Sequence, residues 1–123
     1  MGGPDDPGKK PGPLPVVRPD QRAIPREQPA HLSAALALKV VRLIAADTDN
    51  IVVIQYGRRR AQQRNITRRQ IELCVQRGTI VEGPFLNQHG NWQMNFYRHA
   101  AGEEVTCVVA IAWATRVLVI NAF

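Results

Sequence analysis

The first feature of the chain is a helical repeat of apolar residues between positions 31 and about 46. Leucine, valine and isoleucine recur there at steps of three and four, while Lys39 and Arg42 fall between them. This spacing predicts an amphipathic helix that packs one face against the rest of the domain. Turn-forming residues at 47–50 then end the helix. The apolar stripe consists of Leu32, Leu36, Val40, Leu43 and Ile44.

Residues 68–77 carry the most complete helix signal in the sequence. Thr67 stands at the N-cap position, and Gln70, three residues later, completes a capping box. Ile71 begins the apolar stripe of this helix, and Gly78 predicts a left-handed residue that stops it.

Two shorter segments precede this helix. The run of four β-branched residues at 51–54 predicts a short buried strand. The basic stretch at 56–64 contains no β-branched residue and favours a short helix.

After Gly78 the hydrophobic period changes from helical to alternating. Residues 79–81 are strand-like, and glycine and proline at 83–84 are expected to end that strand. Residues 92–99 alternate, which predicts a sheet with one dry and one wet face. Two nearly apolar stretches, 105–113 and 117–123, are expected to be central strands. The pattern predicts an α+β fold in which N-terminal helices pack on a small antiparallel β-sheet.

The domain organisation follows from the prolines. Residues 1–30 hold eight of the nine prolines and four of the nine glycines, which disfavour helix and central strand. We expect a disordered Pro/Gly-rich arm over 1–30 and a single domain over 31–123. The arm is either a passive tail or a segment that orders on a partner, with Arg18, Arg22 and Arg26 as phosphate contacts.

Charge changes this picture because it is concentrated. The chain of 123 residues has a net charge of +6. Residues 51–78 contain seven arginines and one glutamate, which equals the entire excess. Such clustering predicts a localised anion-binding face, with nucleic acid as the leading partner.

Other classes are disfavoured. No apolar run is long enough for a membrane span, and the N-terminus lacks an apolar signal segment, so we expect a cytoplasmic protein without a membrane partner. Cys74 and Cys107 belong to no paired-cysteine motif and are expected to be buried small apolar residues. No phosphate-binding glycine loop, metalloprotease motif or catalytic-serine signature occurs. Neither a metal nor another cofactor is implied.

One stretch carries a family resemblance. Residues 56–67 read Y-G-R-R-R-A-Q-Q-R-N-I-T. From about residue 50 to its end the chain resembles the bacterial domain of unknown function 4258 family, which has a short strand followed by H-A-x-x-R-M-x-x-R-x-I-[ST]. Arg60 and Arg64 match the paired arginines of that pattern. Tyr56 and Gly57 depart from it, because they stand where the family has histidine and alanine.

The resemblance implies a toxin-like fold related to the RelE, ParE and MqsR group of toxin-antitoxin systems. Many members of that group resemble metal-independent ribonucleases. It therefore implies an endoribonuclease that cleaves mRNA and is covered by an acidic antitoxin protein. Two alternatives stay open: a non-catalytic module of the same fold that binds nucleic acid or protein, and a ParE-like toxin directed at DNA gyrase.

Metal-free RNA cleavage needs a base, an acid and cations that hold the phosphate. Arg60 and Arg64, four residues apart, would share one helical face and hold the scissile phosphate. Tyr56 and His99 are the candidates for proton transfer, with a packed phenol ring and an incidental surface histidine as the plain alternatives. The other RNA-binding candidates, which a solvated surface would also explain, are Arg58, Arg59, Arg68, Arg69 and Arg98.

Strand parity places Arg98 opposite to His99, so Arg98 reaches the site only if a bulge shifts the strand. His31 and His89 are expected to be incidental. Trp92 and Trp113 are expected in the core rather than as stacking platforms.

Overall fold

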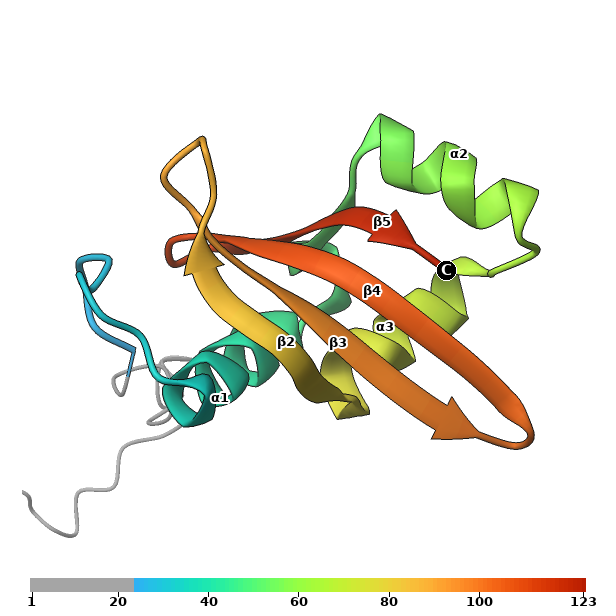
Figure 1. Ribbon diagram of the computed structural model, residues 1–123, viewed down its shortest axis with the longest axis horizontal. Coiled ribbons are helices and arrows are strands. Elements are labelled where there is room, and N and C mark those ends of the chain that lie inside the picture. The colour runs from blue at the N-terminus through green and yellow to red at the C-terminus, as the bar shows by residue number, and fades with distance from the viewer. Residues whose placement is uncertain (1–23) are drawn as a thin grey trace, which may run out of the picture.

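Residues 24–123, which the computed structural model describes, form an α+β fold (Figure 1). None of the helices in this part of the chain has the length and apolar character that crossing a membrane requires. The elements are α1 (Ala34–Ala45), the 3-10 helix η2 (Thr48–Asn50), β1 (Ile51–Val53), α2 (Gln55–Gln63), α3 (Arg68–Arg77), β2 (Thr79–Leu86), β3 (Trp92–Ala100), β4 (Glu103–Ala112) and β5 (Arg116–Ala122).

The five strands form one sheet in the order β1-β5-β4-β3-β2. From β2 to β5 the strands run antiparallel, as predicted, but β1 pairs with β5 in parallel, with Val52 opposite Leu118. The expectation of a wholly antiparallel sheet is therefore wrong at this edge. Alternation along a strand shows which residues share a face but says nothing about the direction of the neighbouring strand.

The core lies between the sheet and two helices on one of its faces. α1 and α3 contact each other, and together they contact β2, β3, β4 and β5. Trp92, Met94 and Phe96 alternate along β3 and are buried on this face, which confirms the predicted dry side. Cys74 and Cys107 are buried free thiols in the same core, as expected.

The opposite face of the sheet, here called the open face, carries the wet side of β3. Strand pairing places Gln93 beside Ala110, and Ala110 beside Leu118, in one row across three strands. No described helix covers this row; instead α2 packs against β5. In Figure 1, α2 and the β2–β3 loop both rise toward the top of the view at opposite ends of the sheet, whereas α1 lies at the bottom.

The helix predicted at 68–77 is α3, with both bounds as expected. The Thr67 side chain accepts a hydrogen bond from the backbone N–H of Gln70, and the Gln70 side chain accepts one from the N–H of Thr67. Gly78, however, is extended (φ −75°, ψ −179°) rather than left-handed. The reason for glycine at position 78 is the lack of room for a side chain, because a Cβ atom there would lie 2.7 Å from the carbonyl oxygen of Tyr97.

β2 continues to Leu86, past the glycine and proline that were expected to end it. The ladder between β2 and β3 shifts register on both sides of Glu82. β2 tolerates Pro84 because it is an edge strand, where a missing N–H costs no central hydrogen bond. The strand signal at 51–54 is confirmed as β1, although Val52 is exposed.

Both tryptophans hold the segment that precedes α1. The indole N–H of Trp113 donates to the carbonyl oxygen of Pro25 at 2.8 Å, and that of Trp92 donates to Pro29 at 3.0 Å. Trp92 is part of the core, as expected, and the partly buried Trp113 packs against that core. Residues 24–30 of the expected arm therefore lie against the domain, and its remainder, 1–23, lies outside the described residues.

Candidate nucleic-acid interface

Helix α2 is placed directly on β5. The N–H of Ile54 donates to the carbonyl oxygen of Val119 at 3.1 Å, which continues the β1–β5 ladder into the start of the helix. Gly57 and Ala61 are the buried residues of α2. A Cβ atom on Gly57 would lie 2.7 Å from the carbonyl oxygen of Val119. The close approach of helix and strand thus depends on the missing side chain.

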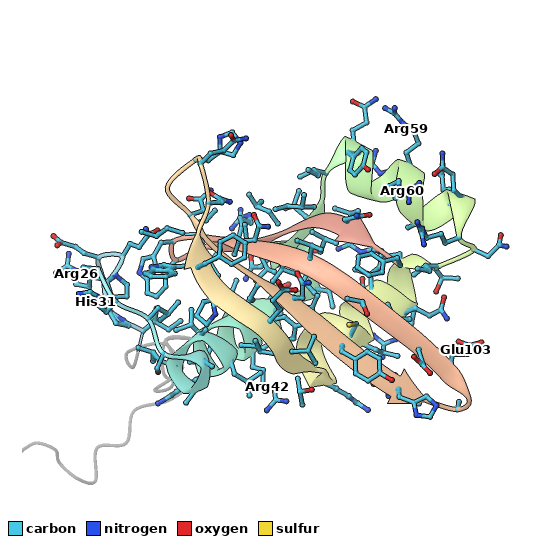
Figure 2. All side chains as sticks on the ribbon, in the orientation of Figure 1. Arg26, His31, Arg42, Arg59, Arg60 and Glu103 are labelled. Atoms are coloured by element: carbon cyan, nitrogen blue, oxygen red, sulfur yellow. The ribbon has the colours of Figure 1, made fainter. Side chains whose placement is uncertain are left out.

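The two sides of α2 face different surroundings. Arg58 and Gln62 line a cavity of about 360 Å³ that also reaches Arg68 and α3. An α-helix advances by about 100° per residue. Tyr56 and Arg60 therefore fall on the other side of α2, toward the open face. Figure 2 shows Arg59 and Arg60 on this helix.

Arg60 and Arg64 sit one turn apart near the end of α2. The Nη1 of Arg60 donates to the Oε1 of Gln63 at 2.9 Å, and its Nε is buried without a partner among the described residues. The guanidinium of Arg64 lies 5.8 Å from the ring centroid of Phe123. Neither arginine forms an ion pair with a carboxylate in residues 24–123, nor do Arg58 and Arg59.

Arg68 has a different role. Its Nη2 donates to the carbonyl oxygens of Ile51 at 2.7 Å and Thr48 at 3.0 Å, which ties α3 to β1. Its Nε donates to Glu72 at 2.9 Å, and Arg69 pairs with the same carboxylate at 3.3 Å. The hydrogen bond from Arg68 lowers the pKa of Glu72, with that from Arg69 acting in the same direction. Glu72 therefore offsets part of the charge of α3.

Arg98 and His99 lie away from α2. The β3–β4 ladder runs without a bulge from Trp92 to Ala100, so Arg98 stays on the helix face, beside Gln70 and Glu103. His99 is exposed on the open face, opposite Glu104 at the tip of the hairpin. His99 belongs to β3, and β4 lies between β3 and β5. The distance between β3 and β5 is therefore about 10 Å. In Figure 2 the neighbouring Glu103 lies well away from Arg60.

A groove of about 260 Å³ occupies the open face next to α2. Leu118, Ile120 and Ala110 form its apolar part, and Ile54 bounds it at the start of α2. Across the groove, its other wall is built from the β2–β3 loop and the start of β3. That wall consists of Asn87, Gln88, His89, Asn91 and Gln93.

The sequence reasoning missed this groove. His89 was expected to be incidental, because nothing near it in the chain shows that its loop stands over β4 and β5. Gln93 had a detectable signal, since the alternation of β3 already placed it on the wet face.

The described part of the interface offers cations and hydrogen-bonding groups rather than metal ligands. No group of three or more His, Cys, Asp or Glu residues suited to a metal ion occurs within residues 24–123. At the far end of the open face, partial burial and the carboxylate of Glu104 raise the pKa of Tyr97. Tyr56, Arg60 and Arg64 are thus the predicted site residues that the fold brings together, and His99 and Arg98 remain apart.

The family model described as a domain of unknown function, DUF4258, matches residues 57–123. Neither a curated protein nor a solved structure matches the chain. The match begins within α2 and covers α3 and all four antiparallel strands, which is more than half of the chain. The chain therefore belongs to the DUF4258 family.

Proposed function

We propose that this protein is a toxin of a toxin-antitoxin system that binds mRNA and cleaves it as a metal-independent endoribonuclease. One observation carries the proposal. Four arginines of the α2 region, Arg58, Arg59, Arg60 and Arg64, have no carboxylate partner in the described chain, and Arg60 and Arg64 lie on the side of α2 away from the cavity that Arg58 lines. Unpaired guanidinium groups beside an open surface suit a polyanion.

Arg60 and Arg64 are the proposed ligands of the scissile phosphate. A guanidinium group presents a planar fork of N–H donors that matches two phosphate oxygens. The Nε of Arg60 is buried, so a phosphate would be held by the terminal nitrogens, one of which also donates to Gln63. Packing against Phe123 limits the positions available to Arg64.

Tyr56 is the proposed proton-transfer group. It lies one helical turn before Arg60 on the same side of α2, and its side chain is 52% exposed. A phenol hydroxyl beside a bound phosphate can exchange a proton with a ribose or a leaving oxygen. His99 is too far along the hairpin to act on the same phosphate, so we assign it at most to a neighbouring nucleotide.

A second function, a non-catalytic RNA-binding module, is favoured by one specific feature. Within the described residues, α2 contains neither a histidine nor a carboxylate. A site with one phenol and several arginines binds phosphate well but has few groups for proton transfer.

An acidic antitoxin is the proposed protein partner. The same unpaired arginines that suit RNA also suit a negatively charged polypeptide. Covering them would block RNA binding, which explains how a cell could tolerate the protein. The relation to the RelE and MqsR toxin folds is part of this proposal and rests on the resemblance of residues 56–67.

The decisive experiment incubates the full chain with labelled RNA in EDTA and resolves the products at single-nucleotide resolution. The variants are Arg60→Ala/Arg64→Ala and Tyr56→Phe, with Arg77→Ala as the matched control, because Arg77 is exposed at the far end of α3. We expect discrete cuts from the wild type and Arg77→Ala, none from the double variant, and strongly slowed cleavage by Tyr56→Phe.

Binding is measured on the same samples. If the RNA stays intact but is still bound, the ribonuclease function is wrong and the RNA-binding module is the function. A wild-type protein that neither cuts nor binds RNA would overturn both functions and direct attention to a ParE-like protein target.

A further inference from the structure

The groove on the open face combines an aliphatic floor with a polar wall. Leu118, Ile120 and Ala110 supply the floor from β5 and β4, and Ile54 closes the end next to α2. The opposite wall carries three asparagine or glutamine side chains besides that of Gln93, and one imidazole, from His89. An apolar surface faced by a few hydrogen-bonding groups is typical of a small-ligand site.

The loop that carries His89 is held by its own hydrogen bonds. The Oδ1 of Asn87 accepts from the N–H of His89 at 2.9 Å and from that of Asn91 at 3.0 Å. The side chain of Gln28 donates to the carbonyl oxygen of Gly90 at 2.8 Å, which ties the loop tip to the segment before α1. His89 therefore stands on a braced loop at the groove.

The amide of Gln93 is oriented by its neighbour. The Nδ2 of Asn87 donates to the Oε1 of Gln93 at 3.1 Å. This bond uses the oxygen and leaves the Nε2 of Gln93, with two N–H donors, without a partner in the described residues. Asn95, the next polar residue along the same face, differs from Gln93 because its amide nitrogen already donates to the carboxylate of Glu82 at 3.0 Å.

We propose that this groove holds one nucleobase of a single-stranded RNA whose phosphates lie on the arginines of α2; the inference rests on the proposed RNA binding. Unpaired RNA bases are recognised by stacking and by hydrogen bonds to their edges. The aliphatic floor and the imidazole of His89 cover the faces of the base, and the Nε2 of Gln93 donates to its edge.

The free N–H donors of Gln93 can reach an acceptor on the edge of any base. Uracil, cytosine and guanine present carbonyl oxygens, and adenine presents the ring nitrogens N1, N3 and N7. The site therefore holds an unpaired base without selecting one base type. Ile54, which bounds the groove, is the N-cap of α2, so the groove adjoins the start of the helix that carries the proposed phosphate ligands.

Anisotropy of dye-labelled 2′-O-methyl hexauridylate and hexaadenylate tests this, because these oligonucleotides lack the 2′-hydroxyl and survive a ribonuclease. We expect the wild-type chain to bind both oligonucleotides. Gln93→Leu should bind each of them about five- to tenfold more weakly through the lost hydrogen bond, with an unchanged salt dependence. His89→Ala should weaken both by about tenfold through lost stacking. Gln62→Leu, on the other side of α2, is the matched control and should behave as the wild type.

Gln93→Glu provides a second variant of nearly the same shape, in which the donor becomes an acceptor. It should reduce the binding of both oligonucleotides more than Gln93→Leu does, while thermal unfolding shows that the fold is kept. Affinities of Gln93→Leu and His89→Ala equal to those of the wild type would overturn the base site and leave the RNA-binding proposal intact. No binding of either by the wild type would overturn the RNA-binding proposal itself, and the base site with it.

Discussion

The guanidinium of Arg64 lies 5.8 Å from the centroid of the Phe123 ring, so the end of α2 packs on the residue that follows β5. Arg64 is one of the two arginines proposed to hold phosphate. A cation over an aromatic face is attracted to it and loses rotational freedom. The end of β5 thus positions a side chain of the proposed interface.

The Phe123 ring can be tested without altering any proposed RNA contact. Phe123→Leu should weaken RNA binding by about 0.5–1 kcal/mol, because an exposed cation–π pair is worth about that much. Phe123→Tyr keeps the ring and should restore the affinity. Titration of labelled RNA measures both variants. Equal affinity of the leucine variant and the wild type would mean that the ring does not position Arg64.

Gly57→Ala tests the contact between α2 and β5. Alanine normally stabilises a helix by about 1 kcal/mol relative to glycine. Here its Cβ would lie 2.7 Å from the carbonyl oxygen of Val119, so we expect a net loss of about 1–3 kcal/mol in the free energy of unfolding. Urea denaturation measures it, with the exposed Arg59→Ala of the same helix as the control. A stabilised Gly57→Ala protein would contradict the close packing.

Cys74 and Cys107 come from α3 and β4, and both are buried free thiols of the core. The Cys74 thiol also approaches the carbonyl oxygens of Phe96 at 3.5 Å and Val105 at 3.4 Å. The neighbouring Cys74 thiol, together with burial, raises the pKa of Cys107 well above its ordinary value.

We therefore expect neither thiol to react with Ellman's reagent in the native protein at neutral pH, because a buried neutral thiol is a poor nucleophile. Both should react once guanidinium chloride unfolds the chain. Thr79→Cys adds an exposed thiol and is the positive control. Rapid native labelling of the wild type would show that the helix face opens readily.

Glu72 predicts how stability depends on pH. The hydrogen bond from Arg68 lowers the pKa of this carboxyl group in the folded protein, so folding favours its ionised form. Its contribution is present above the unfolded pKa of about 4.3 and is lost as the pH falls through the lower folded value.

Glu72→Gln should accordingly reduce stability at pH 7 by about 1 kcal/mol or less, since the paired arginines are largely exposed. The difference from the wild type should shrink toward zero in strongly acidic solution. Thermal unfolding followed over a pH series measures this. Glu82→Gln, whose carboxylate has no arginine partner in the described chain, should show no comparable trend. A constant difference at every pH would contradict the ion-pair explanation.

The sequence by itself determined the elements whose signals lie within a few residues. The capping box of Thr67 and Gln70 set the start of α3. The alternation along β3 separated the buried Phe96 from the half-buried Gln93. The clustered arginines located the basic segment that became α2. These features could be predicted because capping bonds and side-chain periods are local properties of the backbone.

Only the tertiary structure decided how these elements meet. It placed β1 parallel to β5, kept His99 away from Arg60, brought His89 over the open face, and directed Arg68 to the backbone of β1. These outcomes depend on strand order and on contacts between residues far apart in the chain, which no local pattern encodes. The proposed site therefore has a basic side that was readable from the sequence and a base-binding side that exists only in the folded sheet.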